Sequence, residues 1–330
     1  METEMSKQYL VTVIIPIYNV RNYIARCATS LMKQTLDDVE FIFVDDASPD
    51  DSINVLHSVL EQYPKRLSDV TILTHTENQG LPAARNTGLL RARGRYIFHC
   101  DSDDYVESSM LQDMYEFAED NNADIVWADW YLSMGNRERY MSMPDFEAPQ
   151  EAVKAMLSGG MKYNVWNKLV RTSLYTENRI MFPSGYGMGE DLTMIKLFVF
   201  ADKVVHLSKA YYHYNKTNTA AFSQTYSDRH LIELRHNIDD ISNFVLEKFG
   251  VEYEQEIAFL KLEAKFPFLL FPDIKKIKIW KSWYPESNRF IKQNRYITKR
   301  NRMLQQWAAK DLWLLVKGYN ILFNKIIVFR

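Results

Sequence analysis

The chain has 330 residues, and 47% of them are hydrophobic, which allows a large core and excludes a mainly disordered protein. The formal net charge of −2 conceals an asymmetry, because residues 261–330 carry 16 Lys and Arg against 4 Asp and Glu. The main body is therefore acidic and disfavours nucleic acid as a partner, whereas the basic last part is a candidate for contact with an anionic surface.

The two cysteines, Cys27 and Cys100, are too few for a disulfide framework or a zinc cluster, which fits a reducing compartment. Residues 1–8 are short and polar, without the apolar core of a signal peptide. No window reaches the ~18 uncharged apolar residues of a membrane span. We therefore expect a cytoplasmic protein that is soluble or peripheral to a membrane.

Short apolar runs alternate with helical segments over residues 10–130. Nearly continuous runs, as in strands buried on both faces, occur at residues 11–15, 39–44, 70–73, 96–100 and 125–128. The alternation predicts βαβ units, and hence an α/β fold with a mainly parallel, Rossmann-like sheet flanked by helices. In such sheets ligands bind beyond the carboxyl ends of the strands.

The remaining sequence is less regular before it becomes helical. A helix is predicted at residues 190–201 and a short strand at 203–207, and the pattern is helical from about residue 228. We therefore expect a catalytic domain over residues 1–225 and a helical, basic and aromatic C-terminal region over residues 226–330.

Acidic residues follow two of the predicted strands. Asp45 and Asp46 come after the second run, and Asp101, Asp103 and Asp104 come after the fourth. Three carboxylates within four residues repel one another, so a cation is expected between them. Oxygen ligands suit Mg²⁺ or Mn²⁺, which commonly bind one or two carboxylates together with substrate phosphates. The alternative is a solvated acidic turn that caps the next helix.

Five short motifs occur in a specific order. They are Pro16-Ile17-Tyr18-Asn19, Asp45-Asp46, the segment from Asn78 to Asn86 that contains Arg85, Asp101-Ser102-Asp103-Asp104, and Gly189-Glu190-Asp191. Over residues 10–220 this set resembles the large family 2 of inverting glycosyltransferases, which share the GT-A fold. The resemblance implies a hexosyltransferase-type enzyme of bacterial surface-polysaccharide synthesis. Its donor would be a nucleoside-diphosphate sugar, with uridine favoured, and its acceptor a carbohydrate or lipid-linked glycan.

The resemblance also implies residue roles. The donor nucleotide would contact Pro16, Tyr18, Asn19, Asp46, Arg85, Asp101 and Ser102. Asp103, with Asp101, would hold Mn²⁺ or Mg²⁺ between the two phosphates, and Asp191 would be the general base. The acceptor would contact Trp166, Lys168 and Glu190.

Several of these residues also have a purely structural interpretation. Arg85 could be an ion-pair partner of Asp101, and Trp166 could be a core residue. Asp191 could simply be one of the acidic residues favoured in a first helical turn. His213, in an aromatic segment further along, is more consistent with a packed or exposed histidine than with a metal ligand. Ala47 replaces the Gly usual in the family, so a left-handed backbone there would be mildly strained.

The last segment has an apolar stripe at three- to four-residue spacing, formed by Leu304, Ala308, Leu312, Leu315, Tyr319, Leu322, Ile326 and Phe329. Lysines lie off this stripe, which is the pattern of a basic amphipathic helix at a membrane surface. The alternative is a helix packed on the catalytic domain or on another subunit.

Other functions fit less well. A sugar nucleotidyltransferase or a dinucleotide-dependent oxidoreductase would have a Gly-rich loop after the first strand, where this chain has Pro16-Ile17-Tyr18-Asn19. A non-catalytic scaffold with the same fold would be expected to lose some of the carboxylates at 46, 101, 103 and 191. All four are present.

Overall fold

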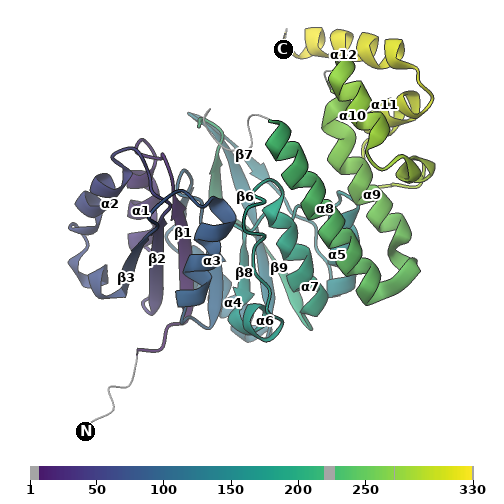
Figure 1. Cartoon of the computed structure of the whole chain (residues 1–330). Helices are drawn as coiled ribbons and strands as arrows, with labels where there is room; N and C mark the ends of the chain where they lie inside the picture. Colours follow the sequence, from purple (N-terminus) through teal and green to yellow (C-terminus); the bar gives the residue numbers. More distant parts are fainter. Residues whose placement is uncertain (1–6, 219–226, 271, 329–330) are drawn as a thin grey trace. The chain divides into compact units, whose positions relative to one another are not determined.

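The computed structural model of the protein describes residues 7–218, 227–270 and 272–328, with side chains described up to residue 322. The chain forms two compact units (Figure 1). The first contains residues 1–150 and 163–237, and the second contains residues 151–162 and 238–330. The expected division into a catalytic domain that ends at residue 225 and a C-terminal region that begins at residue 226 stays a prediction.

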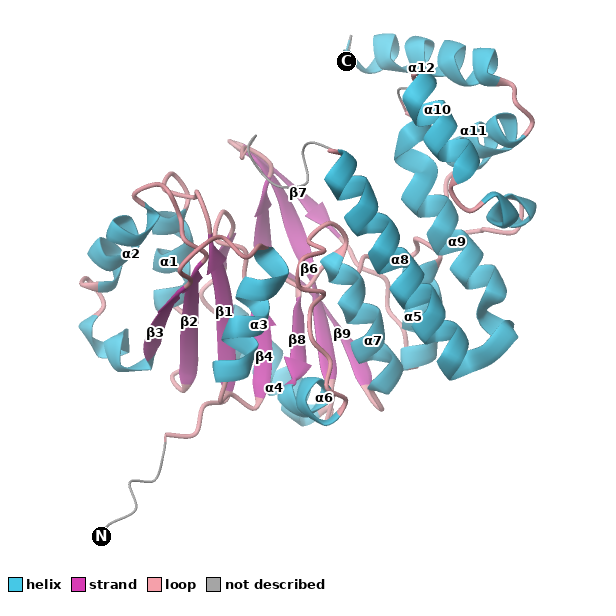
Figure 2. Cartoon of the chain, in the orientation of Figure 1, coloured by secondary structure: helices cyan, strands magenta, loops and turns pink. Residues whose placement is uncertain are grey.

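The first unit is built on one sheet with the strand order β3-β2-β1-β4-β8-β6-β9-β5, and β7 pairs with β6. Figure 2 shows this sheet from β3 to β9. The four strands at one end are parallel, as the apolar runs predict. They are β1 (Val11–Ile17), β2 (Val39–Asp45), β3 (Val70–Thr74) and β4 (Tyr96–His99). Every residue of β1, β2 and β4 is buried, which explains why these runs show no polar alternation.

The other half of the sheet is mixed rather than parallel. It contains β5 (Tyr105–Val106), β6 (Ile125–Met134), β7 (Arg137–Met141), β8 (Lys168–Arg171) and β9 (Val204–Asn215). β8 runs antiparallel to both β4 and β6, whereas β9 is parallel to β6 and antiparallel to β5. β9 is much longer than the expected strand at residues 203–207, and it reaches back to the segment that follows β4.

Helices connect and cover these strands. They are α1 (Ile24–Met32), α2 (Ser52–Leu60), α3 (Leu81–Arg91), α4 (Met110–Asp120), α6 (Thr172–Glu177) and α7 (Thr193–Phe200), with short 3-10 turns at Pro64–Asp69 and Glu190–Leu192. α3 packs on β1 and β2. A Cβ atom added at Gly88 would lie 2.5 Å from Cγ2 of Ile14, so glycine lets α3 approach the sheet closely.

The second unit is helical, as expected from about residue 228. Its helices are α5 (Pro149–Leu157), the later part of α8 (Asp228–Phe249), α9 (Glu254–Lys265), α10 (Ile274–Ser282), α11 (Lys299–Ala309) and α12 (Trp313–Val328), with 3-10 turns at Gly250–Tyr253, Phe266–Leu269 and Pro285–Phe290. The Lys265 ammonium is buried in its core, where it donates to the carbonyls of Trp283 and Tyr284 and to Oδ1 of Asn288.

The apolar stripe of the last segment does not lie on one continuous helix, which corrects that expectation. Chain direction changes between α11 and α12, where Asp311 has a left-handed φ of 60°. Leu304 and Ala308 are buried on α11, whereas the later leucines of the stripe, Leu312, Leu315 and Leu322, are exposed. The Ile326 side chain and Phe329 lie outside the described residues. In the part of the chain that was described, no helix has the length and hydrophobicity needed to cross a membrane.

Candidate active site

The acidic motifs lie at the carboxyl ends of the parallel strands. Asp45 ends β2, Asp46 follows it, and Asp101 to Asp104 follow β4. Because β2 and β4 both pair with β1 in parallel, these ends share one edge of the sheet. The structure therefore places both motifs where a ligand of an open α/β sheet is expected.

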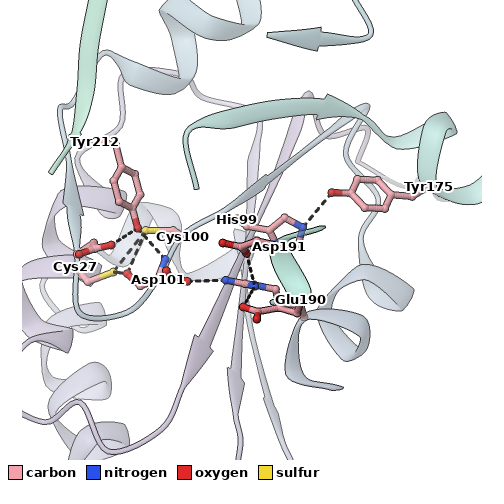
Figure 3. Close-up of polar contacts among 10 residues, drawn as sticks. Cys27, His99, Cys100, Asp101, Tyr175, Glu190, Asp191 and Tyr212 are labelled. Atoms are coloured by element: carbon pink, nitrogen blue, oxygen red, sulfur yellow. Dashed lines mark hydrogen bonds and ion pairs between the residues drawn. The ribbon is translucent and has the colours of Figure 1, made fainter. Parts of the chain in front are cut away.

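Arg85 is the centre of a buried ion-pair cluster. Its side chain is 1% exposed and lies on α3, which begins after Gly80 with a φ of 88°. One guanidinium nitrogen donates to Oδ1 of Asp101 at 2.9 Å. The other donates to Oε1 of Glu190 at 2.8 Å and, at 3.3 Å, to Oδ1 of Asp191. Figure 3 shows Asp101, Glu190 and Asp191 meeting at this point.

Ion pairing with the three carboxylates, rather than contact with water, keeps the Arg85 guanidinium positively charged. Burial by itself lowers the pKa of Arg85, but the charges of Asp101, Glu190 and Asp191 outweigh it and raise that pKa. The geometry agrees with the ion-pair interpretation of Arg85. Contact of Arg85 with a donor nucleotide stays a prediction.

Glu190 and Asp191 differ in the solvent exposure of their side chains. They lie in the 3-10 turn after Gly189, whose φ of 87° is left-handed. The Glu190 side chain is 10% exposed and the Asp191 side chain 28%. Burial and the neighbouring carboxylates raise the pKa of both groups, and Arg85 opposes that rise. Asp191 is thus the carboxylate of the pair that an incoming hydroxyl group can reach more easily.

Asp103 and Asp104 have different environments. Oδ2 of Asp103 accepts from the Asn218 amide at 2.8 Å, and burial together with the Asp101 charge raises the pKa of Asp103 to about 6. Asp104 is fully buried and accepts from the Tyr212 hydroxyl and from the Asn215 backbone N–H, each at 2.7 Å. Asp104 therefore anchors β9 to the acidic motif and caps no helix.

The oxygen chemistry of Asp101 and Asp103 fits a hard divalent cation. Burial raises the pKa of Asp103, and the nearby Asp101 charge adds to the rise, so a positive charge beside Asp103 would be favourable. No three His, Cys, Asp or Glu side chains of the described residues are grouped closely enough to hold an ion by themselves. The two carboxylates would accordingly hold Mn²⁺ or Mg²⁺ together with other oxygen ligands, such as phosphates.

The predicted nucleotide-binding residues lie at the same sheet edge. Pro16 is within β1, Tyr18 is 48% exposed, and Asn19 has a left-handed φ of 54°. Ala47 also has a φ of 54°, so the expected strain at this non-glycine residue is present. Ser102 is buried within the acidic motif. The exposed Tyr18 is available to stack on a base.

Asp46 is largely occupied by its own protein contacts. It is 3% exposed, and its oxygens contact His75 Nδ1 at 2.7 Å and accept from the backbone N–H groups of Gln79 and Gly80 at 2.8 Å. It therefore holds the loop before α3 in place. A contact between Asp46 and a nucleotide base stays a prediction.

The two predicted acceptor residues before and within β8 are buried. Trp166 is 6% exposed, with ring centroids 4.5 Å from Tyr212 and 5.3 Å from Tyr214 in stacked arrangements, as the core interpretation predicts. Lys168 is 0% exposed. His213 stacks on Tyr105 and contacts Glu107 and Glu138, which agrees with a packed histidine.

Sequence reasoning missed three residues that organise the site. His75 contacts Asp46, Asn218 donates to Asp103, and Tyr212 donates to Asp104 and accepts from the Asp101 backbone N–H at 3.0 Å. Of the three, only Tyr212 has a sequence feature that could have pointed to the site, because it lies in a dense aromatic run near the expected end of the domain. The contacts of the other two depend on pairings between distant segments.

The fold and the site define the class of this protein as an α/β protein of the GT-A type, with a carboxylate-lined edge at the ends of parallel strands. The model of Glycosyl transferase family 2 matches residues 12–188, and the chain belongs to this family.

Named relatives and solved structures agree with this assignment. The uncharacterized glycosyltransferase EpsJ of Bacillus subtilis is 35% identical over 234 residues, which are 67% of this chain and 66% of EpsJ. The poly(ribitol-phosphate) beta-N-acetylglucosaminyltransferase TarS of Staphylococcus aureus is 30% identical over 65% of this chain, but over only 37% of TarS. A crystal structure of TarS residues 1–349 in complex with UDP-GlcNAc has a TM-score of 0.69 and covers 94% of this chain and 90% of that one at 22% identity, which shows the shared fold.

Replacing Arg85 tests the ion-pair cluster. Arg85→Met leaves three carboxylates without their common cation, so we expect a loss of about 3–5 kcal/mol in the free energy of unfolding at pH 7. The uncompensated carboxyl groups then have folded-state pKa values above their unfolded values. The loss should therefore shrink as the pH falls to 5 and these groups bind protons.

Urea titrations at both pH values measure the effect of Arg85→Met. Arg289→Met is the control, because Arg289 and its ion-pair partner Glu254 are 61% and 57% exposed, so its loss should cost about 0.5 kcal/mol or less. An Arg85→Met loss no larger than the control, or one independent of pH, contradicts the charge balance described above.

Proposed function

We propose that the protein is an inverting glycosyltransferase that moves a sugar from a nucleoside diphosphate, with a UDP-sugar favoured, to a carbohydrate or lipid-linked glycan. The observation that carries this proposal is the Arg85 cluster, which joins the acidic motif after β4 to the acidic pair before α7. A donor-binding carboxylate and a candidate base thereby lie on two sides of one guanidinium. Family membership supports the same reaction class.

The donor side of the proposed site is the edge formed by β1, β2 and β4. Tyr18 would stack on the base, with Pro16, Asn19 and Asp46 beside it, and Asp101 and Ser102 would face the ribose or sugar hydroxyls. A nucleoside diphosphate suits this edge because the acidic motif can share a cation with its phosphates. The UDP and UDP-GlcNAc complexes named for S. aureus TarS support uridine as the base to test first.

Asp101 and Asp103 would hold the Mn²⁺ or Mg²⁺ ion. When bound, such an ion offsets the negative charge that develops on the leaving diphosphate. The chain itself then needs no acid on the leaving side. Its contribution there is to orient Asp101 through Arg85 and Asp103 through the Asn218 amide.

Asp191 is the proposed general base. It would take the proton from the acceptor hydroxyl as that oxygen bonds to the anomeric carbon and the bond to the diphosphate breaks. Attack opposite the leaving group inverts the anomeric configuration, and a single base is sufficient. Asp191 fits better than Glu190 because it is more exposed and lies further from the guanidinium. Glu190, Trp166 and Lys168 would shape the acceptor side.

The second unit is proposed to bring the enzyme to an anionic membrane surface on the cytoplasmic side. α12 exposes large apolar side chains, including Leu314 at 86% and Leu322 at 65%, within the part of the chain that carries the excess of lysine and arginine. Apolar side chains among cations suit the boundary of an anionic lipid layer. A lipid-linked acceptor would be reached there.

Donor binding is predicted to depend on Asp103. UDP with Mn²⁺, at about 100 times its dissociation constant, should stabilise the wild-type protein by about 2.7 kcal/mol, measured as a thermal shift. Asp103→Ala should abolish the part of this shift that requires Mn²⁺. The control, Asp113→Ala, removes a carboxylate that accepts hydrogen bonds from Lys209 and Tyr211, and it should keep the Mn²⁺-dependent thermal shift. Equal Mn²⁺-dependent shifts in wild type and Asp103→Ala contradict the metal assignment.

Transfer is predicted to depend on Asp191. Asp191→Asn should keep the UDP shift and lower the rate of sugar transfer by about 10²–10⁴, because an amide accepts no proton. Transfer is followed as UDP release from a panel of UDP-sugars with a membrane extract as acceptor. Asp202→Asn, an exposed acid of the same unit, is the control. Near wild-type transfer by Asp191→Asn would rule out this base.

Membrane contact is predicted to depend on the exposed leucines of α12. The full chain should sediment with phosphatidylglycerol vesicles and much less with phosphatidylcholine vesicles. Leu314→Glu with Leu322→Glu should reduce sedimentation at least tenfold, whereas Leu67→Glu, at an exposed leucine of the first unit, should have no effect. Vesicle binding that is unchanged in the double variant contradicts this proposal.

A further inference from the structure

The loop over residues 183–189, which leads to the proposed base, is rich in glycine. Gly185, Gly187 and Gly189 alternate with other residues directly before the turn that holds Asp191. Gly185 has a φ of 84° and Gly189 a φ of 87°, both left-handed. Glycine loses more backbone freedom on ordering than any other residue. The loop therefore depends on contacts from outside itself to keep one conformation.

Helix α8 supplies such contacts to Met188. Glu233 and Asn237 lie about one turn apart on the part of α8 that belongs to the first unit. Oε2 of Glu233 accepts from the Met188 backbone N–H at 3.1 Å, and the Asn237 amide donates to the Met188 carbonyl at 2.9 Å. The same amide donates to the Tyr186 carbonyl at 2.8 Å. One face of α8 thus binds both polar groups of the Met188 backbone.

This contact between α8 and the loop is buried and closely packed. Glu233 is 5% exposed and Asn237 is 3% exposed. A Cβ atom added at Gly189 would lie 3.1 Å from Cδ1 of Leu234, so the helix approaches the loop backbone closely. A buried carbonyl that loses its donor is costly, because water does not replace the lost hydrogen bond. The loop conformation is therefore strongly coupled to the two side chains.

The backbone that α8 holds continues directly into the turn of the proposed base. Arg85 contacts the Asp191 side chain at 3.3 Å, which is longer than its contacts with the other two carboxylates. The start of the loop is held separately by Asn86 of α3, which accepts from the Phe182 backbone N–H at 2.8 Å and donates to the Phe182 carbonyl at 2.9 Å. α3 thus fixes one end of the loop, and α8 fixes the end next to Asp191.

We propose that Glu233 and Asn237 are positioning residues, which hold the Met188 backbone so that Asp191 points at the acceptor hydroxyl. This inference rests on the proposed function of Asp191 as the base. A base must lie within hydrogen-bonding reach of the proton that it takes, and a displacement of about 1 Å can lower the rate about 10²-fold. The inference also extends the catalytic machinery beyond residue 225, where the sequence predicts that the catalytic domain ends.

Hydrogen exchange tests whether Asn237 holds the loop. Asn237→Leu is similar in size but cannot donate to the two carbonyls. In the full chain with UDP and Mn²⁺, exchange measured by mass spectrometry should become about tenfold faster or more over residues 186–192 and stay unchanged over β1 to β4. Asn121→Leu is the matched control, because Asn121 is exposed and its amide donates to the Phe117 carbonyl of its own helix.

Sugar transfer tests whether holding the loop positions the base. Asn237→Leu should keep the thermal shift with UDP and Mn²⁺, because the proposed donor residues lie on other elements. Its kcat for UDP release, measured with the panel of UDP-sugars and a membrane extract, should fall about 10–100-fold while the KM for the UDP-sugar changes less than about twofold. A merely structural role would lower the amount of folded protein, counted by UDP binding, without lowering kcat per folded molecule.

If Asn237→Leu does not fold, Glu233→Met replaces it, because this change removes the acceptor of the Met188 N–H. Unchanged exchange over residues 186–192, or a wild-type kcat in the folded variant, overturns the inference. Faster exchange combined with full transfer by Asp191→Asn overturns the proposed base instead and leaves the contact between α8 and the loop intact.

Discussion

The buried guanidinium of Arg85 is the interaction on which the rest of the site depends. At 1% exposure this cation is stable only because Asp101, Glu190 and Asp191 surround it. The three carboxylates in turn can lie close together largely because they share this cation. Asp101 comes from the edge that would hold the donor, and Asp191 from the turn that would face the acceptor. One electrostatic balance therefore joins the two halves of the proposed reaction.

The mixed half of the sheet supplies the framework for this balance. β9 runs back to the acidic motif. There the Tyr212 hydroxyl and the Asn215 backbone N–H donate hydrogen bonds to Asp104, and the nearby Asn218 amide donates one to Asp103. β8 brings in Lys168, fixed through Asn167 to β6. Asp46 and Asp104 thus hold neighbouring segments in place through buried hydrogen bonds, whereas the Asp191 side chain is 28% exposed. These three residues are all aspartates, so burial and hydrogen bonding, rather than residue type, distinguish them.

The sequence predicted those features of the fold that depend on residues close together in the chain. The apolar runs are confirmed as β1 to β4, of which β1, β2 and β4 are buried throughout, and the acidic motifs follow β2 and β4 at the sheet edge. The antiparallel pairing of β8 has no local signature, because it depends on segments far apart in the chain. The contacts of Arg85 with Glu190, 105 residues away, arise in the same way. The break between α11 and α12 was missed because the apolar spacing continues through Asp311, whose backbone turns left-handed.

In the proposed reaction a single carboxylate acts opposite the leaving diphosphate. The anomeric configuration of the product tests it most directly. Sugar transferred from an α-linked UDP-sugar should appear β-linked, with the large anomeric proton coupling of a β-gluco or β-galacto unit in the NMR spectrum of the isolated product. A product that keeps the α configuration would contradict the account, because retention requires a different arrangement of groups around the anomeric carbon.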